Sequence, residues 1–171
     1  MNKLYVMMFS GGRTSAVLAK HLKNNPNKYT KVIYVFLNTG KEVEKTLQFV
    51  DRCNKEWGLN VVWLEAKVID EKGKGTTYKI VDFETASRNG EPFESMLEKY
   101  PLPNNIASNC TRELKQRPVD SYLRENYKGF DITRVIGIRA DEAHRKSIHA
   151  KKEKIIYPLC DEVPFNERMV R

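Results

Sequence analysis

The chain has 171 residues, of which 40% are hydrophobic and 30% charged, proportions typical of a globular protein with a single domain. Its longest apolar runs, residues 4–9 and 32–37, are six residues each, whereas a membrane-spanning helix needs about 20. The N-terminus has no signal-peptide pattern, so we expect a cytoplasmic protein with no membrane partner. The net charge of +8 favours anionic partners such as nucleotides or nucleic acid.

The first third of the chain alternates between strand and helix patterns. Residues 4–9, 32–37 and 61–64 are continuous apolar runs, as expected for buried parallel strands. Between them, residues 16–22 and the amphipathic segment 43–57 are predicted helices. This β-α-β-α-β order predicts an α/β fold, with an open, mainly parallel twisted sheet and helices on both faces.

The remaining chain is less regular. We expect a break or restart of its longest helix at Pro118, because proline lacks the backbone donor. No internal repeat or interdomain linker is visible, so we expect one domain over residues 1–171. The predicted elements are a polar loop at 73–77, a strand or extended segment at 79–83, a turn at 88–92, a helix at 93–100, a loop at 101–109, a helix at 111–127 and a strand at 135–138.

Polar sequences follow three of the predicted strands, at residues 10–15, 38–40 and 139–142. Ligands of open α/β sheets bind beyond the carboxyl ends of the strands. The sequence SGGRTS at 10–15 has glycines that allow close backbone approach, hydroxyl donors, and a helix start that offers free N–H groups. It matches neither the Walker nor the Rossmann pattern. From these residues alone, a phosphate-binding loop and a tight structural turn are about equally favoured.

Five segments resemble one known family, in the family's order, between residue 4 and about residue 160. SGGRTS resembles the pyrophosphate-binding loop of the adenine nucleotide α-hydrolase superfamily. The others resemble the phosphoadenylyl sulfate reductase branch of that superfamily, and the chain is most similar to its short, often phage-encoded members. These four are NTGKE at 38–42 with Thr46, CTRELK at 110–115 with Pro118, GIRADE at 137–142 with Arg145, and YPL at 157–159.

The resemblance implies a HUP-like α/β fold and an enzyme acting on an adenine nucleotide at its α-phosphate side. The nucleotide would be phosphoadenylyl sulfate, adenylyl sulfate or ATP. The phosphate or sulfate would be bound by Ser10, Gly11, Gly12, Arg13, Thr14 and Ser15. The nucleoside would be contacted by Phe36 near adenine, and by Asn38, Thr39, Gly40 and Glu42, the last of which could instead cap the following helix. The candidate catalytic residues are Cys110, Lys115, Arg139 and Arg145.

The cysteines depart from the family's reductases. The chain has no ECGLH-like C-terminal motif with a nucleophilic cysteine, and it ends soon after YPL, so we expect a C-terminal segment to be absent and do not expect thiol-dependent reduction by these residues. Without CxxC we expect no iron–sulfur cluster. Cys110 lies beside Arg112 and Lys115 in the sequence, an electropositive setting. It is either a reactive, sulfur-carrying residue or an inert wall of the substrate site, and the second is favoured.

Two alternatives concern the acidic residues and the partner. Asp141 and Glu142 could be Mg²⁺ ligands, or could orient Arg139 and Arg145 through ion pairs, which we favour. The alternative functions are an ATP pyrophosphatase or sulfur-transfer enzyme that modifies nucleic acid, and a non-catalytic phage nucleotide-binding module. Residues 144–154, with five Lys or Arg against one Glu, are a candidate nucleic-acid surface or a solvated loop. A thiol electron donor or a nucleic-acid acceptor would be the partner, and a homo-oligomer is compatible with the sequence.

Overall fold

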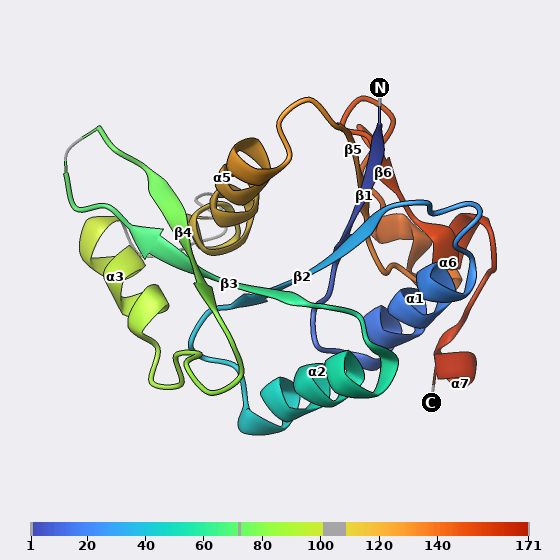
Figure 1. Cartoon of the computed structure of the whole chain (residues 1–171), viewed down its shortest axis with the longest axis horizontal. Coiled ribbons are helices and arrows are strands. Elements are labelled where there is room, and N and C mark those ends of the chain that lie inside the picture. The colour runs from blue at the N-terminus through green and yellow to red at the C-terminus, as the bar shows by residue number, and fades with distance from the viewer. Residues whose placement is uncertain (1, 72, 101–108, 171) are drawn as a thin grey trace. The chain divides into compact units, whose positions relative to one another are not determined.

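A computed structural model describes residues 2–71, 73–100 and 109–170 (Figure 1). The strands are β1 (Lys3–Met8), β2 (Val32–Asn38), β3 (Val62–Val68), β4 (Thr76–Val81), β5 (Asp131–Val135) and β6 (Ile155–Ile156). The helices are α1 (Arg13–Asn24), α2 (Glu44–Trp57), α3 (Glu91–Lys99), α4 (Asn109–Thr111), the π-helix η1 (Arg112–Gln116), α5 (Arg117–Asn126), the 3₁₀-helix η2 (Ala140–Arg145), α6 (Pro158–Asp161) and α7 (Glu167–Val170).

The strands form one open sheet in the order β4-β3-β2-β1-β5-β6. β1 pairs in parallel with both β2 and β5, so that Val6 lies between Ile33 and Arg134. β5 pairs in parallel with β6, whereas β4 at the opposite edge pairs antiparallel with β3. The predicted α/β fold with an open, mainly parallel sheet is therefore confirmed.

The chain divides into two compact units. Unit 1 comprises residues 1–35, 52–61 and 129–171, and unit 2 comprises residues 36–51 and 62–128. In unit 1, the centre of β1 is buried on both faces, with Leu4, Val6 and Met7 fully inaccessible. This explains its continuous apolar run, because a parallel strand covered on both faces has no solvent-facing side. The adjoining helix α1 buries only one stripe, which includes Leu18 and Leu22.

Unit 2 contains the antiparallel pair β3–β4 and the helices α3, η1 and α5. Ala66 of β3, Met96 of α3 and Leu114 of η1 form a buried apolar cluster. The ring of Phe36 packs edge-on against Trp63, with centroids 4.7 Å apart. The cluster packs α3 and η1 against β3, and the ring contact joins β2 to β3.

The last strand predicted from the sequence was wrong in position. The strand was expected at residues 135–138, but β5 runs over Asp131–Val135. Asp131, Thr133 and Arg134 interrupt its apolar pattern, and the pairing with β1 decides its register. The polar loop expected at 73–77 also ends early, because β4 begins at Thr76. In the loop expected at 101–109, residues 101–108 lie outside the described residues.

The predicted restart near Pro118 is confirmed and has a physical cause. The helical stretch continues from Asn109 into α5 through the π-helix η1, in which the N–H of Arg117 donates to the carbonyl of Arg112, five residues earlier. Pro118 then occupies the first turn of α5, where its missing N–H is tolerated. A single wider turn thus accommodates the proline without ending the helical stretch.

Candidate functional site

The 10–15 loop of unit 1 leads from β1 into α1. Gly11 has a φ of +75°, which glycine adopts without strain. Gly12 is the extended N-cap of α1, and the first hydrogen bond of the helix runs from Ala16 N to Gly12 O, at 3.1 Å. The N–H groups of the three preceding residues therefore point out of the helix start, at the positive end of its dipole. This geometry suits an anion.

The hydroxyl groups of the loop have different roles. Ser15 is 3% exposed, and its hydroxyl donates to Gly12 O at 2.7 Å. Ser10 donates to the Ser15 hydroxyl at 3.2 Å, and its side chain is exposed. Thr14 is half-buried. Ser15 thus holds the loop in shape, while Ser10 and Thr14 remain accessible to a ligand.

Arg139 approaches this loop within unit 1. Its Nη1 lies 3.4 Å from Thr14 Oγ1. Gly137, two residues earlier, passes close to the start of α1, where an added Cβ would lie 3.7 Å from the Ser15 Cα. The GIR segment therefore runs past the first turn of α1, and the Arg139 guanidinium lies beside the 10–15 loop.

Two carboxylates hold Arg139. Asp141 accepts two hydrogen bonds from it, at 3.0 and 3.2 Å, and Glu142 lies 3.3 Å from Nη1. The hydrogen bond from Arg139 lowers the pKa of Asp141. Arg145, with a side chain 60% exposed, pairs with Glu142 at 2.6 Å. The ion pairs expected in the favoured alternative are thus present. Among residues 2–71, 73–100 and 109–170, no group of three or more His, Cys, Asp or Glu side chains could hold a metal ion.

In unit 2, the segment after β2 is held by its own side chains. Asn38 is fully buried and donates to Glu65 Oε1 at 2.7 Å and to Ser87 O at 2.8 Å. Its Oδ1 accepts from Gly40 N at 3.1 Å. The Thr39 hydroxyl donates to a carboxylate, that of Glu42, at 3.1 Å. The side-chain amide of Asn38 therefore makes its hydrogen bonds within the protein. Thr39 is the more accessible of the two side chains.

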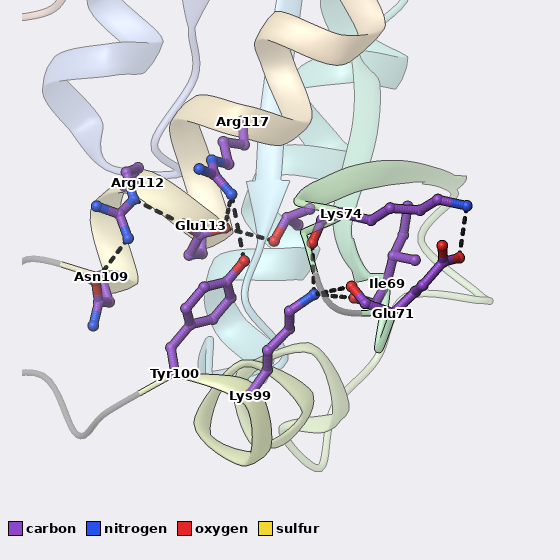
Figure 2. A network of polar contacts seen from close by, with 10 residues as sticks. Ile69, Glu71, Lys74, Lys99, Tyr100, Asn109, Arg112, Glu113 and Arg117 are labelled. Carbon is purple, nitrogen blue, oxygen red and sulfur yellow. Dashed lines mark hydrogen bonds and ion pairs between the residues drawn. The ribbon is translucent and has the colours of Figure 1, made fainter.

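A buried carboxylate, Glu113, lies in η1 among polar partners that include Arg112 and Arg117 (Figure 2). It accepts hydrogen bonds from Thr76 at 2.7 Å and Arg112 at 2.8 Å, and it pairs with Arg117 at 3.0 Å. Burial would raise the pKa of Glu113, but these hydrogen bonds and the charge of Arg117 outweigh it, so the pKa lies below its usual range. The same figure shows Lys99 donating to backbone carbonyls of the β3–β4 loop, including Lys74 O at 2.6 Å.

The remaining predicted residues of unit 2 have contrasting surroundings. Lys115, in η1, is exposed. Cys110 is half-buried and packs against the cluster of Ala66, Met96 and Leu114. Phe36, predicted near adenine, is 1% exposed. The predicted residues therefore fall into two sets, with the 10–15 loop, Arg139 and Arg145 in unit 1 and the others in unit 2.

The sequence profile of the phosphoadenosine phosphosulfate reductase domain matches residues 4–155, which is most of the chain. The chain belongs to this family. Two relatives are similar to this reductase-family domain. The uncharacterized nin region protein ORF290 of Escherichia phage lambda is 34% identical over 143 residues, covering 82% of this chain and 49% of that protein. The uncharacterized protein MJ0066 of Methanocaldococcus jannaschii is 26% identical over 188 residues, covering 98% of this chain and 34% of that protein.

This reductase-family domain thus spans about half the length of the phage relative and about a third of the archaeal one. The matched range contains all the segments on which the resemblance rested except YPL at 157–159. No helix in the described ranges is long and apolar enough to cross a membrane.

Most basic side chains of the 144–154 segment form ion pairs in the structure. Three of its five basic side chains pair with carboxylates outside the segment: Arg145 with Glu142, Lys146 with Asp161, and Lys154 with Asp131. Lys151 and Lys152 are exposed. Ile148, which is 92% exposed, lies in the same segment. The local positive charge offered to a partner is thus concentrated on two lysines.

Sequence reasoning missed two buried carboxylates, Glu65 and Glu113. A signal for Glu65 existed, because it stands inside the apolar run VWLEA of β3, where a strand side chain faces the interior. For Glu113 the signal was its spacing of four residues from Arg117, which places both on one helix face. Neither pattern reveals the partners that come from other elements, such as Asn38 for Glu65 and Thr76 for Glu113.

Proposed function

We propose that this chain is the nucleotide-binding domain of an enzyme that acts at the α-phosphate side of an adenine nucleotide, either a sulfonucleotide or ATP. The observation that carries the proposal is the placement of Arg139 beside Thr14 at the start of α1. It adds a guanidinium to a helix start whose first N–H groups have no intrahelical partner. The family match over residues 4–155 supports the adenine nucleotide.

The residues of unit 1 would act by binding and by stabilising charge. The N–H groups of Arg13, Thr14 and Ser15, with the Ser10 hydroxyl, would bind the phosphate or sulfate oxygens. Arg139, whose Nε and Nη2 donate to Asp141, would add its positive charge beside the same group, and donors fixed in advance stabilise the negative charge that develops as a bond to phosphorus or sulfur breaks. Asp141 and Glu142 would keep the guanidinium in place. Any Mg²⁺ would then be held mainly by the nucleotide's own phosphates.

The residues predicted in unit 2 complete the proposal. Thr39, Gly40 and Glu42 would contact the nucleoside, with Phe36 behind the base. Lys115 would neutralise a further anionic group, since it is exposed on η1. Reduction of a sulfonucleotide would require a thiol electron donor from a partner.

A second chemistry is ATP cleavage coupled to sulfur transfer onto nucleic acid. The observation that favours it is the net charge of +8, together with the exposed Lys151 and Lys152. Calorimetry separates the two chemistries. Tight binding of phosphoadenylyl sulfate or adenylyl sulfate without Mg²⁺ would support the reductive one, and Mg²⁺-dependent binding of ATP the other. Binding without turnover of any of them would favour a non-catalytic module.

Arg139→Ala tests the assigned loop. We expect it to weaken binding of the preferred nucleotide by about 10-fold or more, because a charge-assisted hydrogen bond is lost. Lys23→Ala is the matched control, since it removes the same charge from the opposite end of α1, about 15 Å along the helix from Arg13. Equal affinity of the two variants, measured by calorimetry, would refute the assignment of the loop.

A further inference from the structure

Glu65 is a buried carboxylate with unusual partners. It lies in β3 between the buried residues Leu64 and Ala66, and it is itself 2% exposed. Its Oε1 accepts from Asn38 Nδ2 at 2.7 Å and from Ser87 N at 2.6 Å, and its Oε2 accepts from the Ser87 hydroxyl at 2.9 Å. All three donors are neutral. Glu113, the other buried glutamate of unit 2, is instead held by two arginines.

This network joins three segments of unit 2 that are far apart in sequence. The first is residues 38–41 after β2, the second is β3, and the third is the turn 87–90 before α3. Asn38 also donates to Ser87 O at 2.8 Å, and Lys41 Nζ donates to Asn89 O at 2.9 Å.

The backbones of the first and third segments also meet closely. Gly40 has a φ of +77°, and a Cβ there would lie 2.9 Å from the Gly90 Cα and 2.9 Å from the Pro92 Cδ. The 38–41 segment is therefore fixed by contacts along its whole length.

The contacts of Asn38 indicate what the network does. Both of its donated hydrogen bonds and the one that its Oδ1 accepts are made inside the protein, and its side chain is fully buried. Its side chain is therefore not in a position to recognise a ligand directly. Through Gly40 N, which is buried, it instead sets the course of the backbone at residues 39–40, and half-buried Thr39 is the residue of this stretch that a nucleoside could meet.

An acid at position 65 is better explained by this geometry than by stability. Burying a carboxylate costs solvation, and a well-packed apolar side chain in its place often stabilises a fold equally well or better. A leucine could not accept hydrogen bonds from Asn38 and Ser87. A carboxylate accepts from several donors at once, and it makes stronger hydrogen bonds than a neutral acceptor.

We propose that Glu65 is a positioning residue for nucleoside recognition, and that through Asn38 and Ser87 it holds the backbone at residues 39–40 in the conformation that presents Thr39 to the nucleoside. This inference rests on the proposed function, because it assumes an adenine nucleotide as ligand. It assigns the nucleoside contact to Thr39, and gives Asn38 and Gly40 an indirect role. It leaves phosphate binding to the 10–15 loop.

The test compares two ligands on three variants by calorimetry. The ligands are the adenine nucleotide that the wild type binds most tightly and inorganic pyrophosphate, which lacks a nucleoside. We expect Glu65→Ala to weaken the nucleotide by about 10-fold, because buried donors lose their acceptor, and to leave pyrophosphate within about 2-fold. Glu65→Gln should stay within about 3-fold for both, since its carbonyl accepts from Asn38 and Ser87 N while its amide donates to the Ser87 hydroxyl.

Leu64→Ala is the matched control for lost stability. It removes a fully buried side chain from the neighbouring position of β3, so it should lower the melting temperature and leave both affinities unchanged. If Glu65→Ala does not fold, Ser87→Ala takes its place, and it should weaken the nucleotide by about 3-fold with pyrophosphate unaffected.

Two results would overturn the proposal. One is wild-type affinity for the nucleotide in Glu65→Ala, or in Ser87→Ala where that variant is used. The other is an equal loss of nucleotide and pyrophosphate. A wild-type protein that binds pyrophosphate but none of the adenine nucleotides would instead refute the proposed function, and with it this inference.

Discussion

The 10–15 loop of unit 1 and the 38–41 segment of unit 2 have similar sequence features and different hydrogen bonding. Each follows a strand, and each has a glycine with a φ near +75°, namely Gly11 at +75° and Gly40 at +77°. In the first, the N–H groups at the start of α1 and an exposed hydroxyl remain available. In the second, Asn38, Gly40 and Lys41 are tied to other parts of the same unit. A polar, glycine-containing turn after a strand can therefore leave its hydrogen-bond donors available to a ligand, or use them for hydrogen bonds within the protein.

The largest expected effect is that of Gly40→Ala. The new Cβ would meet Gly90 and Pro92 at 2.9 Å, and the positive φ is strained for alanine, so we expect a loss of about 2–4 kcal/mol in the free energy of unfolding. Gly129→Ala is the control, because its φ is +88° with nothing within 4 Å, and it should lose only about 1–2 kcal/mol. Urea denaturation measures both. Equal losses would mean that the close packing of the 38–41 segment contributes nothing to the free energy of unfolding.

A smaller effect is expected at the second internal network of unit 2. Glu113→Gln should lower the free energy of unfolding by about 2 kcal/mol at neutral pH, because charge-assisted hydrogen bonds from arginine are lost. The pKa of Glu113 is lowered from 4.5 in the folded state, so its contribution is complete above that value and is lost as the pH falls through the folded-state pKa. The difference between wild type and variant should therefore shrink below about pH 4.5.

Denaturant titrations from about pH 7 to about pH 3 measure this difference. Glu98→Gln, at an exposed position of α3, is the control and should change stability by less than about 0.5 kcal/mol at every pH. A difference for Glu113→Gln that stays constant with pH would show that its carboxylate is not held in its charged form by the arginines.

The smallest effect on stability is expected at Gly12. Its φ is −92°, which any residue adopts, and an added Cβ would meet only Ser10 Oγ at 3.7 Å, so Gly12→Ala should change stability by less than about 0.5 kcal/mol. We nevertheless expect weaker binding of pyrophosphate, by about 5-fold, because the methyl group keeps the anion away from the backbone. A stable variant with unchanged pyrophosphate affinity would contradict the assignment of the loop as an anion site.

Much of the fold could be predicted because its signals are local. The apolar runs at 4–9 and 32–37 correspond to β1 and β2, and the proline in α5 marked the restart of its helix. The strand expected at 135–138 was misplaced because Asp131 and Arg134 interrupt the apolar pattern of β5. Its position depends on pairing with β1, more than 120 residues away along the chain.

The sequence by itself determined the order of strands and helices, the position of a glycine-containing loop between β1 and α1, and a family resemblance that the profile match confirms. These follow from periodicity, glycine and proline positions, and short motifs, all of which are set by neighbours along the chain. Only the tertiary structure decided which polar side chains face inward. Asn38 meets Ser87 across 49 positions, and Thr76 meets Glu113 across 37. The burial of a polar group depends on partners that folding brings to it, and no local pattern contains them.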